Sequence, residues 1–179
     1  MDESSKHYPL PPAAGPEPWL RGTHSETAAV QRAVIHALEL ADEDLIRWCY
    51  DLRDEELNSS PHGLPTVASQ LRHIARSVDR LLTYAEGREL NASQLAALKA
   101  ETDPEAKCER LMQELTSAID NAKFRVGAIR SGGLEAPRSV GRKQLPTTVG
   151  GLLIHVADHT QRHVGQAITT AKVLRALRG

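Results

Sequence analysis

Aromatic residues and cysteines are scarce in this chain of 179 residues. Two Trp, three Tyr and one Phe amount to 3% of the sequence, so the core must be built from aliphatic side chains. The two cysteines, Cys49 and Cys108, form no CxxC pair. This excludes a disulfide scaffold and a zinc finger, and it indicates a reducing compartment.

An excess of charge of one sign is also missing. The 22 Lys and Arg are balanced by 23 Asp and Glu, and no basic block occurs, which argues against nucleic-acid and membrane partners. The acidic start Met-Asp-Glu-Ser-Ser is unlike a secretory signal. The richest apolar run, residues 149–156, is too short to span a bilayer and contains His155. The sequence therefore predicts a soluble, cytoplasmic protein.

The N-terminal segment has a composition of its own. Five of the ten prolines fall within residues 1–22, which excludes a helix or a central strand there. We therefore expect a proline-rich tail over 1–22, either disordered or laid extended over the domain, followed by one domain over 23–179.

Hydrophobic residues recur at helical spacing in four long segments of that domain. The segments span 23–52, 66–87, 103–131, and Thr147 or Thr148 to the C-terminus. No segment alternates like a strand, and four amphipathic helices predict an all-α, four-helix bundle.

The segment boundaries carry further signals. Asp103 is a candidate N-cap of the third helix, and Pro104 suits its first helical position. The linker 88–102 is long enough to cross the bundle and contains a candidate short helix around 93–99.

Three of the eight histidines stand at spacing four in the last segment: His155, His159 and His163. Four residues advance a helix by about 40°, so these side chains form one row at the margin of the apolar face. Two imidazoles one turn apart can hold one divalent metal ion. Spacing alone does not choose between 155/159 and 159/163, and an isolated HxxxH pair is commonly just two polar residues.

A metal held by two imidazoles needs a ligand from another helix, and His73 is the best candidate. It lies at the apolar margin of the second segment, beside Gln70 and Ser77. The remaining histidines are weaker candidates: His36 faces away from the apolar face of its helix, and the others lie in the tail, a linker or a helix start. These are His7, His62 and His24.

Several well-known catalytic motifs are absent. Thr160 follows His159, so there is no HExxH site, and no Glu-x-x-His, phosphate-binding glycine loop or GxSxG motif occurs. Cys108 falls on the apolar stripe of its helix and Cys49 at a stripe edge, so neither is a promising nucleophile.

Two phrases resemble the DinB/YfiT-like superfamily. Residues 152–166, Leu-Leu-Ile-His-Val-Ala-Asp-His-Thr-Gln-Arg-His-Val-Gly-Gln, resemble its last bundle helix, and residues 63–74 resemble the start of its second helix. The resemblance implies an up-down-down-up bundle with His73, His159 and His163 as metal ligands. His155 then becomes a residue of the surrounding pocket. Val164 stands where the family usually carries Arg.

Characterised members of that family are similar to metal-dependent enzymes that use small thiols, as bacillithiol S-transferases or mycothiol-dependent isomerases. The resemblance thus implies a divalent metal, Zn²⁺ or Ni²⁺ before Fe²⁺ or Mn²⁺, activating a low-molecular-weight thiol toward a small electrophilic substrate. We take His155 and Gln166 as catalytic candidates, with Gln166 orienting water, thiol or a ligand histidine. A metal-dependent hydrolase and a non-catalytic metal-binding bundle are the alternatives, and a homodimer is compatible with this fold.

Overall fold

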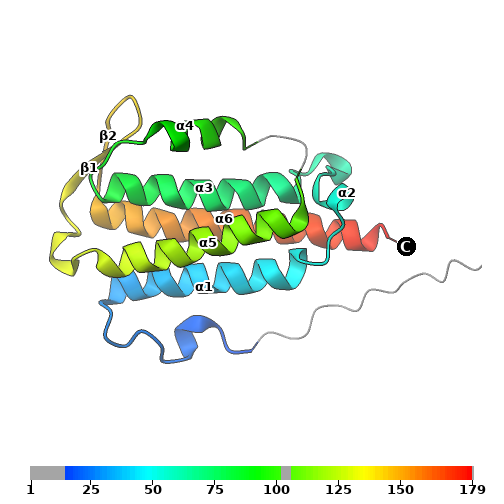
Figure 1. Cartoon of the computed structure of the whole chain (residues 1–179). Coiled ribbons are helices and arrows are strands. Elements are labelled where there is room, and N and C mark those ends of the chain that lie inside the picture. The colour runs from blue at the N-terminus through cyan, green and yellow to red at the C-terminus, as the bar shows by residue number, and fades with distance from the viewer. Residues whose placement is uncertain (1–14, 102–105, 179) are drawn as a thin grey trace, which may run out of the picture.

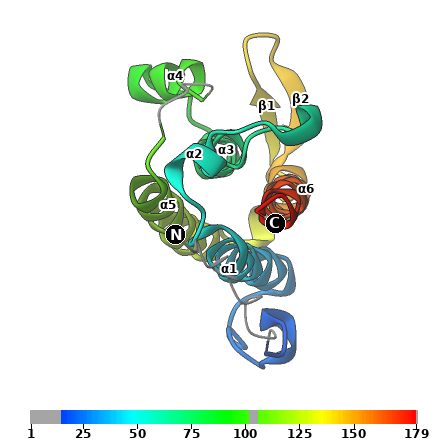
Figure 2. The same cartoon turned by 90° about the vertical axis from the view of Figure 1, so that its right-hand side faces the viewer.

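Four long helices form a bundle in the computed structural model, which describes residues 15–101 and 106–178 (Figure 1). The helices are α1 (Ala29–Cys49), α3 (Val67–Ala85), α5 (Cys108–Ala128) and α6 (Val149–Ala176). The predicted all-α bundle is therefore confirmed. Seen along its axis in Figure 2, α1 and α3 lie at opposite corners, and each packs against both α5 and α6.

Short elements connect the long helices. The linker after α1 contains α2 (Asp54–Leu57) and the 3₁₀ turn η2 (Pro61–Gly63), and α4 (Ala92–Lys99) follows α3. The predicted short helix around 93–99 is thus present. Outside the bundle lie the 3₁₀ turns η1 (Pro18–Leu20) and η3 (Ser131–Gly133), and a hairpin of β1 (Pro137–Val140) and β2 (Leu145–Thr148).

Hydrogen bonds between helices show that α1 and α6 run in the same direction. The Gln161 side chain donates to the carbonyl of Ala37, and further along both helices Arg175 donates to the carbonyl of Trp48.

The other two long helices run the opposite way. Thr170 of α6 donates to the carbonyl of Pro65, just before α3 begins, whereas His159 lies beside the later residue His73. α3 is therefore antiparallel to α6. α5 is parallel to α3. In the segment of chain that joins these two helices, α4 runs back alongside α3 (Figure 1).

The core is aliphatic, as the shortage of aromatic residues requires. Its largest fully buried side chains include a leucine or isoleucine from each long helix: Leu38, Leu45, Leu71, Ile74, Leu115, Ile119 and Leu153. Burial of such surface is the main force that drives helices together. Among the helices formed by residues 15–101 and 106–178, none has the length and hydropathy to cross a membrane.

The first and third helices begin later than the sequence predicts. α1 starts at Ala29 instead of residue 23, because Gly22 and His24 have φ angles of 69° and 57°, which a right-handed helix cannot contain. α5 starts at Cys108 after a non-helical Lys107. The predicted cap residues Asp103 and Pro104 lie outside the described residues.

The part of the predicted proline-rich tail that the structure describes contains one helical turn. Residues 15–28 form an arm along α1, in which Pro18–Leu20 make one turn of 3₁₀ helix with Pro18 buried. Proline suits the first position of a helical turn, where its fixed φ is favourable and its missing N–H is not needed. Residues 1–14 lie outside the described part of the chain.

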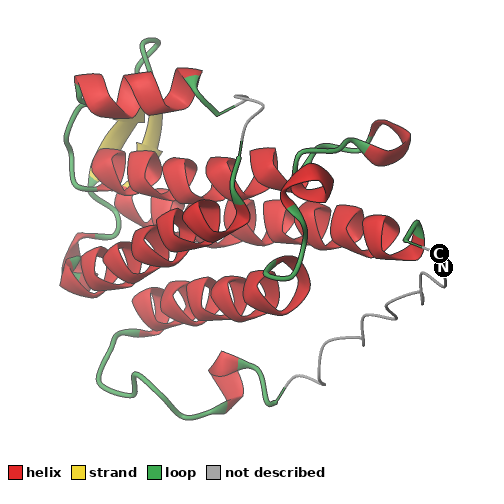
Figure 3. Cartoon of the chain, turned by 45° about the vertical axis from the view of Figure 1, so that its right-hand side comes forward, coloured by secondary structure: helices red, strands yellow, loops and turns green. Residues whose placement is uncertain are grey.

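The hairpin between α5 and α6 was not expected from the sequence. β1 and β2 are antiparallel, with Pro137 opposite Thr148 and Val140 opposite Leu145 (Figure 3). Strands of four residues are too short to show alternation against the helical pattern around them. Thr148 ends the hairpin and caps α6, since its side chain accepts a hydrogen bond from the N–H of Gly151 at 3.0 Å.

The bundle core can be tested at Leu153 of α6, whose side chain is fully buried. Leu153→Ala leaves a cavity, so the free energy of unfolding should fall by about 2–5 kcal/mol. The adjacent Ile154, which is 60% exposed, provides a matched control. Ile154→Ala should change stability by less than about 0.5 kcal/mol. Urea denaturation monitored by circular dichroism measures both free energies of unfolding. Equal losses would contradict the burial of Leu153 and the exposure of Ile154 on α6.

Candidate metal centre

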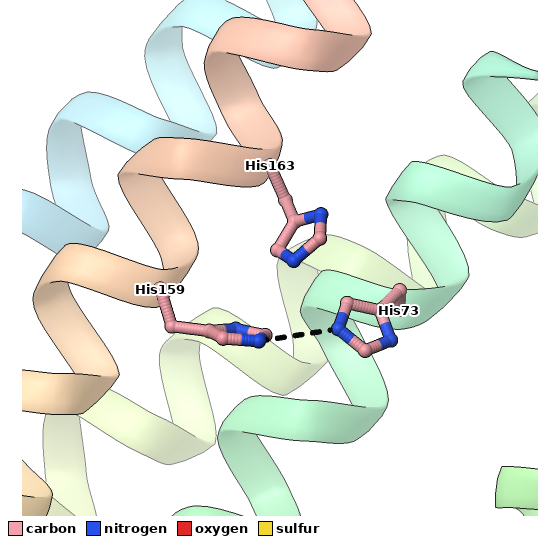
Figure 4. Close-up of side chains that lie close together, drawn as sticks. All are labelled: His73, His159 and His163. Atoms are coloured by element: carbon pink, nitrogen blue, oxygen red, sulfur yellow. Dashed lines mark hydrogen bonds between the residues drawn. The ribbon is translucent and has the colours of Figure 1, made fainter. Parts of the chain in front are cut away.

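Helices α3 and α6 bring three histidines together near the middle of the bundle. His73 of α3 faces His159 and His163 of α6, and Figure 4 shows the three rings converging. The Nε2 atoms of His73 and His159 lie 3.3 Å apart, and the centroids of His73 and His163 are 4.4 Å apart. One ligand atom from each residue lies within 4.8 Å of the others, so the group could hold a metal ion.

The structure chooses between the two pairs that spacing left open. His159 and His163 share the cluster with His73, and all three are half-buried. His155, one turn earlier, is 45% exposed at its side chain, and its Nδ1 lies 3.0 Å from a carboxylate oxygen of Asp158. Its ring centroid still lies 5.2 Å from that of His159, so it borders the cluster.

Two side chains orient the cluster by accepting hydrogen bonds from ring N–H groups on its outer side. His73 Nδ1 lies 2.8 Å from a carboxylate oxygen of Glu101, and His163 Nδ1 lies 2.6 Å from the amide oxygen of Gln70. An acceptor at Nδ1 places the ring proton there and leaves Nε2 with a free lone pair. This arrangement is the usual support of metal-binding histidines.

Glu101 was not identified from the sequence, which offered no obvious carboxylate near the histidines. It follows α4, and its second oxygen lies 2.5 Å from the guanidinium of Arg80 on α3. Burial raises the pKa of Glu101, but hydrogen bonds from His73 and Arg80 outweigh it, and the pKa lies below its ordinary value. No spacing rule connects residue 101 to His73, since the contact depends on how α4 folds back over α3.

The environment keeps two of the imidazoles neutral. The pKa of His159 is lowered to about 4, mainly by burial and to a smaller extent by the charges that His163 and His73 can carry. Burial and His73 also lower the pKa of His163, although a hydrogen bond with Gln166 offsets part of this. Metal ligation requires neutral imidazole, so protons compete weakly with a cation here at neutral pH.

The hydrogen bonds of the cluster are incomplete without a further group. With protons on the Nδ1 atoms of His73 and His163, their Nε2 atoms present two lone pairs that His159 cannot satisfy together. His159 Nδ1 is itself buried and has no hydrogen-bond partner within the described part of the chain. Buried polar atoms are seldom left unpaired. Three converging imidazole nitrogens therefore fit a divalent cation such as Zn²⁺ or Ni²⁺.

A family comparison agrees with this geometry. The family model of the DinB superfamily matches residues 37–167, a range that contains all three histidines. The chain belongs to the DinB superfamily. A search of the curated proteins found no match.

Within this DinB-superfamily chain, Val164 is buried in the core. A buried aliphatic side chain cannot make the polar contacts of an arginine, the residue that the family resemblance implies at this position. Arg162 is exposed and pairs with Asp158 at 3.6 Å. Gln166 is exposed beside His163.

His24, His36, His62 and the two cysteines are not part of the cluster. His62 is exposed in η2, and His7 lies outside the described residues. His36 does lie off the bundle-facing side of α1, but it is buried beneath the arm, with His24 beside it. Cys49 is buried, which raises its pKa to about 12, and burial also raises the pKa of Cys108. Neither thiol is activated as a nucleophile.

Measuring the affinity for Zn²⁺ tests whether Glu101 supports His73 as a metal ligand. Glu101→Ala removes the acceptor at His73 Nδ1 and should weaken Zn²⁺ binding about 10- to 100-fold, as losses of such supporting partners do. Competition with a chelator measures the affinity. Glu114→Ala is the matched control, because Glu114 pairs with Arg76 of α3 at 2.8 Å without touching a histidine. An equal effect of the two substitutions would show that Glu101 acts only through general stability.

Proposed function

We propose that this protein is a metal-dependent enzyme that transfers a small thiol to an electrophilic small molecule. His73, His159 and His163 would hold the metal, with Zn²⁺ or Ni²⁺ as the first choice and Fe²⁺ or Mn²⁺ as alternatives. The proposal is carried by one observation, the convergence of three half-buried imidazoles from two helices. Membership of the DinB superfamily supports it.

The ligand set favours a catalytic over a structural role. Structural zinc sites usually surround the ion with four protein ligands, whereas three neutral histidines leave a position open. When bound, the cation would supply Lewis acidity that lowers the pKa of a thiol or water reaching it. The three histidines have no anionic ligand among them, so the full charge of the cation would remain available.

The residues around the triad would position the reactants. Glu101 and Gln70 hold the rings of His73 and His163 in place through their Nδ1 atoms. Gln166, exposed beside His163, lies where it could orient a bound small molecule. Glu101 is engaged by both His73 and Arg80. It is therefore poorly suited to take a proton from water, which favours a thiol as the nucleophile.

Metal-dependent hydrolysis is the second candidate, and one contact favours it. His155 lies one helical turn from His159, its Nδ1 is 3.0 Å from a carboxylate oxygen of Asp158, and its side chain is 45% exposed. A histidine held by a carboxylate is a competent general base for activating water. The same residue would serve a thiol transferase by accepting the thiol proton.

The metal site is tested by elemental analysis of untagged protein reconstituted with Zn²⁺ or Ni²⁺ and then desalted. The double variant His159→Ala, His163→Ala should carry one metal ion per chain fewer than the wild type, because a single remaining imidazole binds weakly. His155→Ala, one turn away on the same helix, is the matched control and should retain the wild-type content. Equal metal content in wild type and double variant would refute the proposal.

The reaction class is tested by incubating the metal-loaded protein with electrophiles, such as alkyl halides and epoxides, with and without small thiols. A thiol transferase should consume the electrophile only with thiol present, and the triad double variant should lose this activity. Turnover without thiol that falls about 10²- to 10⁴-fold in His155→Ala would instead identify a hydrolase. A lack of turnover across the thiol and electrophile panel would count against catalysis and favour a metal-binding bundle.

A further inference from the structure

A second group of metal-binding side chains lies where the arm, residues 15–28, crosses α1. The arm lies on the outer side of this helix (Figure 1), and polar contacts hold it there. Arg21 forms a bidentate ion pair with Glu43, and His24 Nε2 lies 2.7 Å from a carboxylate oxygen of Glu39. The arm thus reaches a row of side chains on α1 that the bundle core does not use.

His24, Glu39 and His36 form a compact cluster there. The rings of His24 and His36 are tilted against each other with centroids 5.6 Å apart, and Thr23 lies 3.1 Å from His36 Nε2. One ligand atom from each of the three residues lies within 4.8 Å of the other two. His36 is only 7% exposed although it points away from the core. The arm therefore encloses an imidazole that α1 alone would leave in water.

The backbone of the arm is bent in a way that directs His24 onto α1. His24 has a φ of 57°, which is uncommon for a residue with a side chain, and it follows Gly22 with a φ of 69°. Such conformations persist where surrounding contacts maintain them. Here the maintained feature is an imidazole placed between Glu39 and His36.

We propose that His24, His36 and Glu39 bind a second divalent metal ion, preferentially Zn²⁺, which fastens the arm to α1. Two imidazoles and one carboxylate are a known three-ligand set for zinc, with water completing the tetrahedron. Zinc bonds of about 2.0–2.2 Å place tetrahedral ligand atoms about 3.3 Å apart, so the cluster would contract on binding. His24 is carried by the arm and Glu39 has a flexible side chain, so both can make this movement.

This site is separate from the triad and goes beyond the function proposed above. The triad lies between α3 and α6, whereas the arm lies on the far side of α1 from α3 (Figures 1 and 2). The DinB superfamily match begins at Ala37, so two of the three ligands precede it. The second metal would therefore be a feature of this chain in addition to the centre that the family match covers.

The test uses the full untagged chain carrying His159→Ala and His163→Ala, so that only the second site contributes. Equilibrium dialysis with Zn²⁺ should give one ion per chain on this background. Adding His24→Ala or Glu39→Gln should weaken that binding at least about tenfold, because each removes a ligand. His62→Ala is the matched control, since His62 is also a turn histidine with positive φ, at 50°, but is exposed in η2.

A second readout reports on the arm itself. Trypsin can cut after Arg21, and Zn²⁺ should slow this cleavage in the triad variant and in the His62 control, but not after His24→Ala. Mass spectrometry identifies the cleavage site. Zinc binding that is unchanged by both His24→Ala and Glu39→Gln would overturn the proposal, and so would a triad variant that binds no zinc. Neither result would bear on the three-histidine centre, which is reported by the difference in metal content between the wild type and the triad variant.

Discussion

The antiparallel packing of α3 against α6 is the constraint on which the candidate centre depends. A histidine on one helix can meet two on another only if the helices lie in contact with the correct register. Two hydrogen bonds hold that register on one side of the cluster. One joins Thr170 to the carbonyl of Pro65, and the other joins His163 to Gln70. The fully buried Leu71, Ile74 and Leu153 lie on the same two helices. The hydrophobic core thus positions the ligands, because the free energy of burying these side chains sets the helix separation.

Electrostatics complete what packing begins. Arg80 lies against Glu101, Glu101 accepts from His73, and the imidazole presents Nε2 to the cluster. Each contact orients the next, so the ring of His73 has little freedom. The same burial lowers the pKa of His159 and His163, which keeps both rings unprotonated. A cation would meet ligands that are already oriented and neutral, which reduces the cost of binding.

The arm, residues 15–28, makes contacts with the side of α1 that faces away from the bundle core. Residues on the outer side of α1 could have remained solvated, but residues 15–28 lie against them and His36 is buried there. Arg21, Thr23 and His24 each find a partner on α1. Part of the segment that composition describes as a tail is therefore held on α1 by side-chain contacts.

Much of this protein follows from its sequence alone. Apolar residues at helical spacing determined the four long helices, since an aliphatic stripe must be buried. The four-residue step from His159 to His163 put two imidazoles on one face, which is a local property of any helix. The position of His73 at the apolar margin of its own helix made it the candidate third ligand, and the family resemblance favoured 159/163 over 155/159. The helices and their apolar faces depend on residues within a few turns of one another, so the periodicity of the sequence predicts them.

The rest was decided by tertiary structure. The burial of His36, the contact of Glu101 with His73 and the hairpin before α6 join segments whose sequences carry no common pattern. Glu101 is 28 residues from His73 along the chain, and only the return of α4 over α3 brings them within 2.8 Å. His155 and His163 flank His159 symmetrically in sequence, yet only His163 turns toward α3. Sequence spacing fixes which side chains share a helix face, while the partner that each face meets depends on how the helices and connections pack in three dimensions.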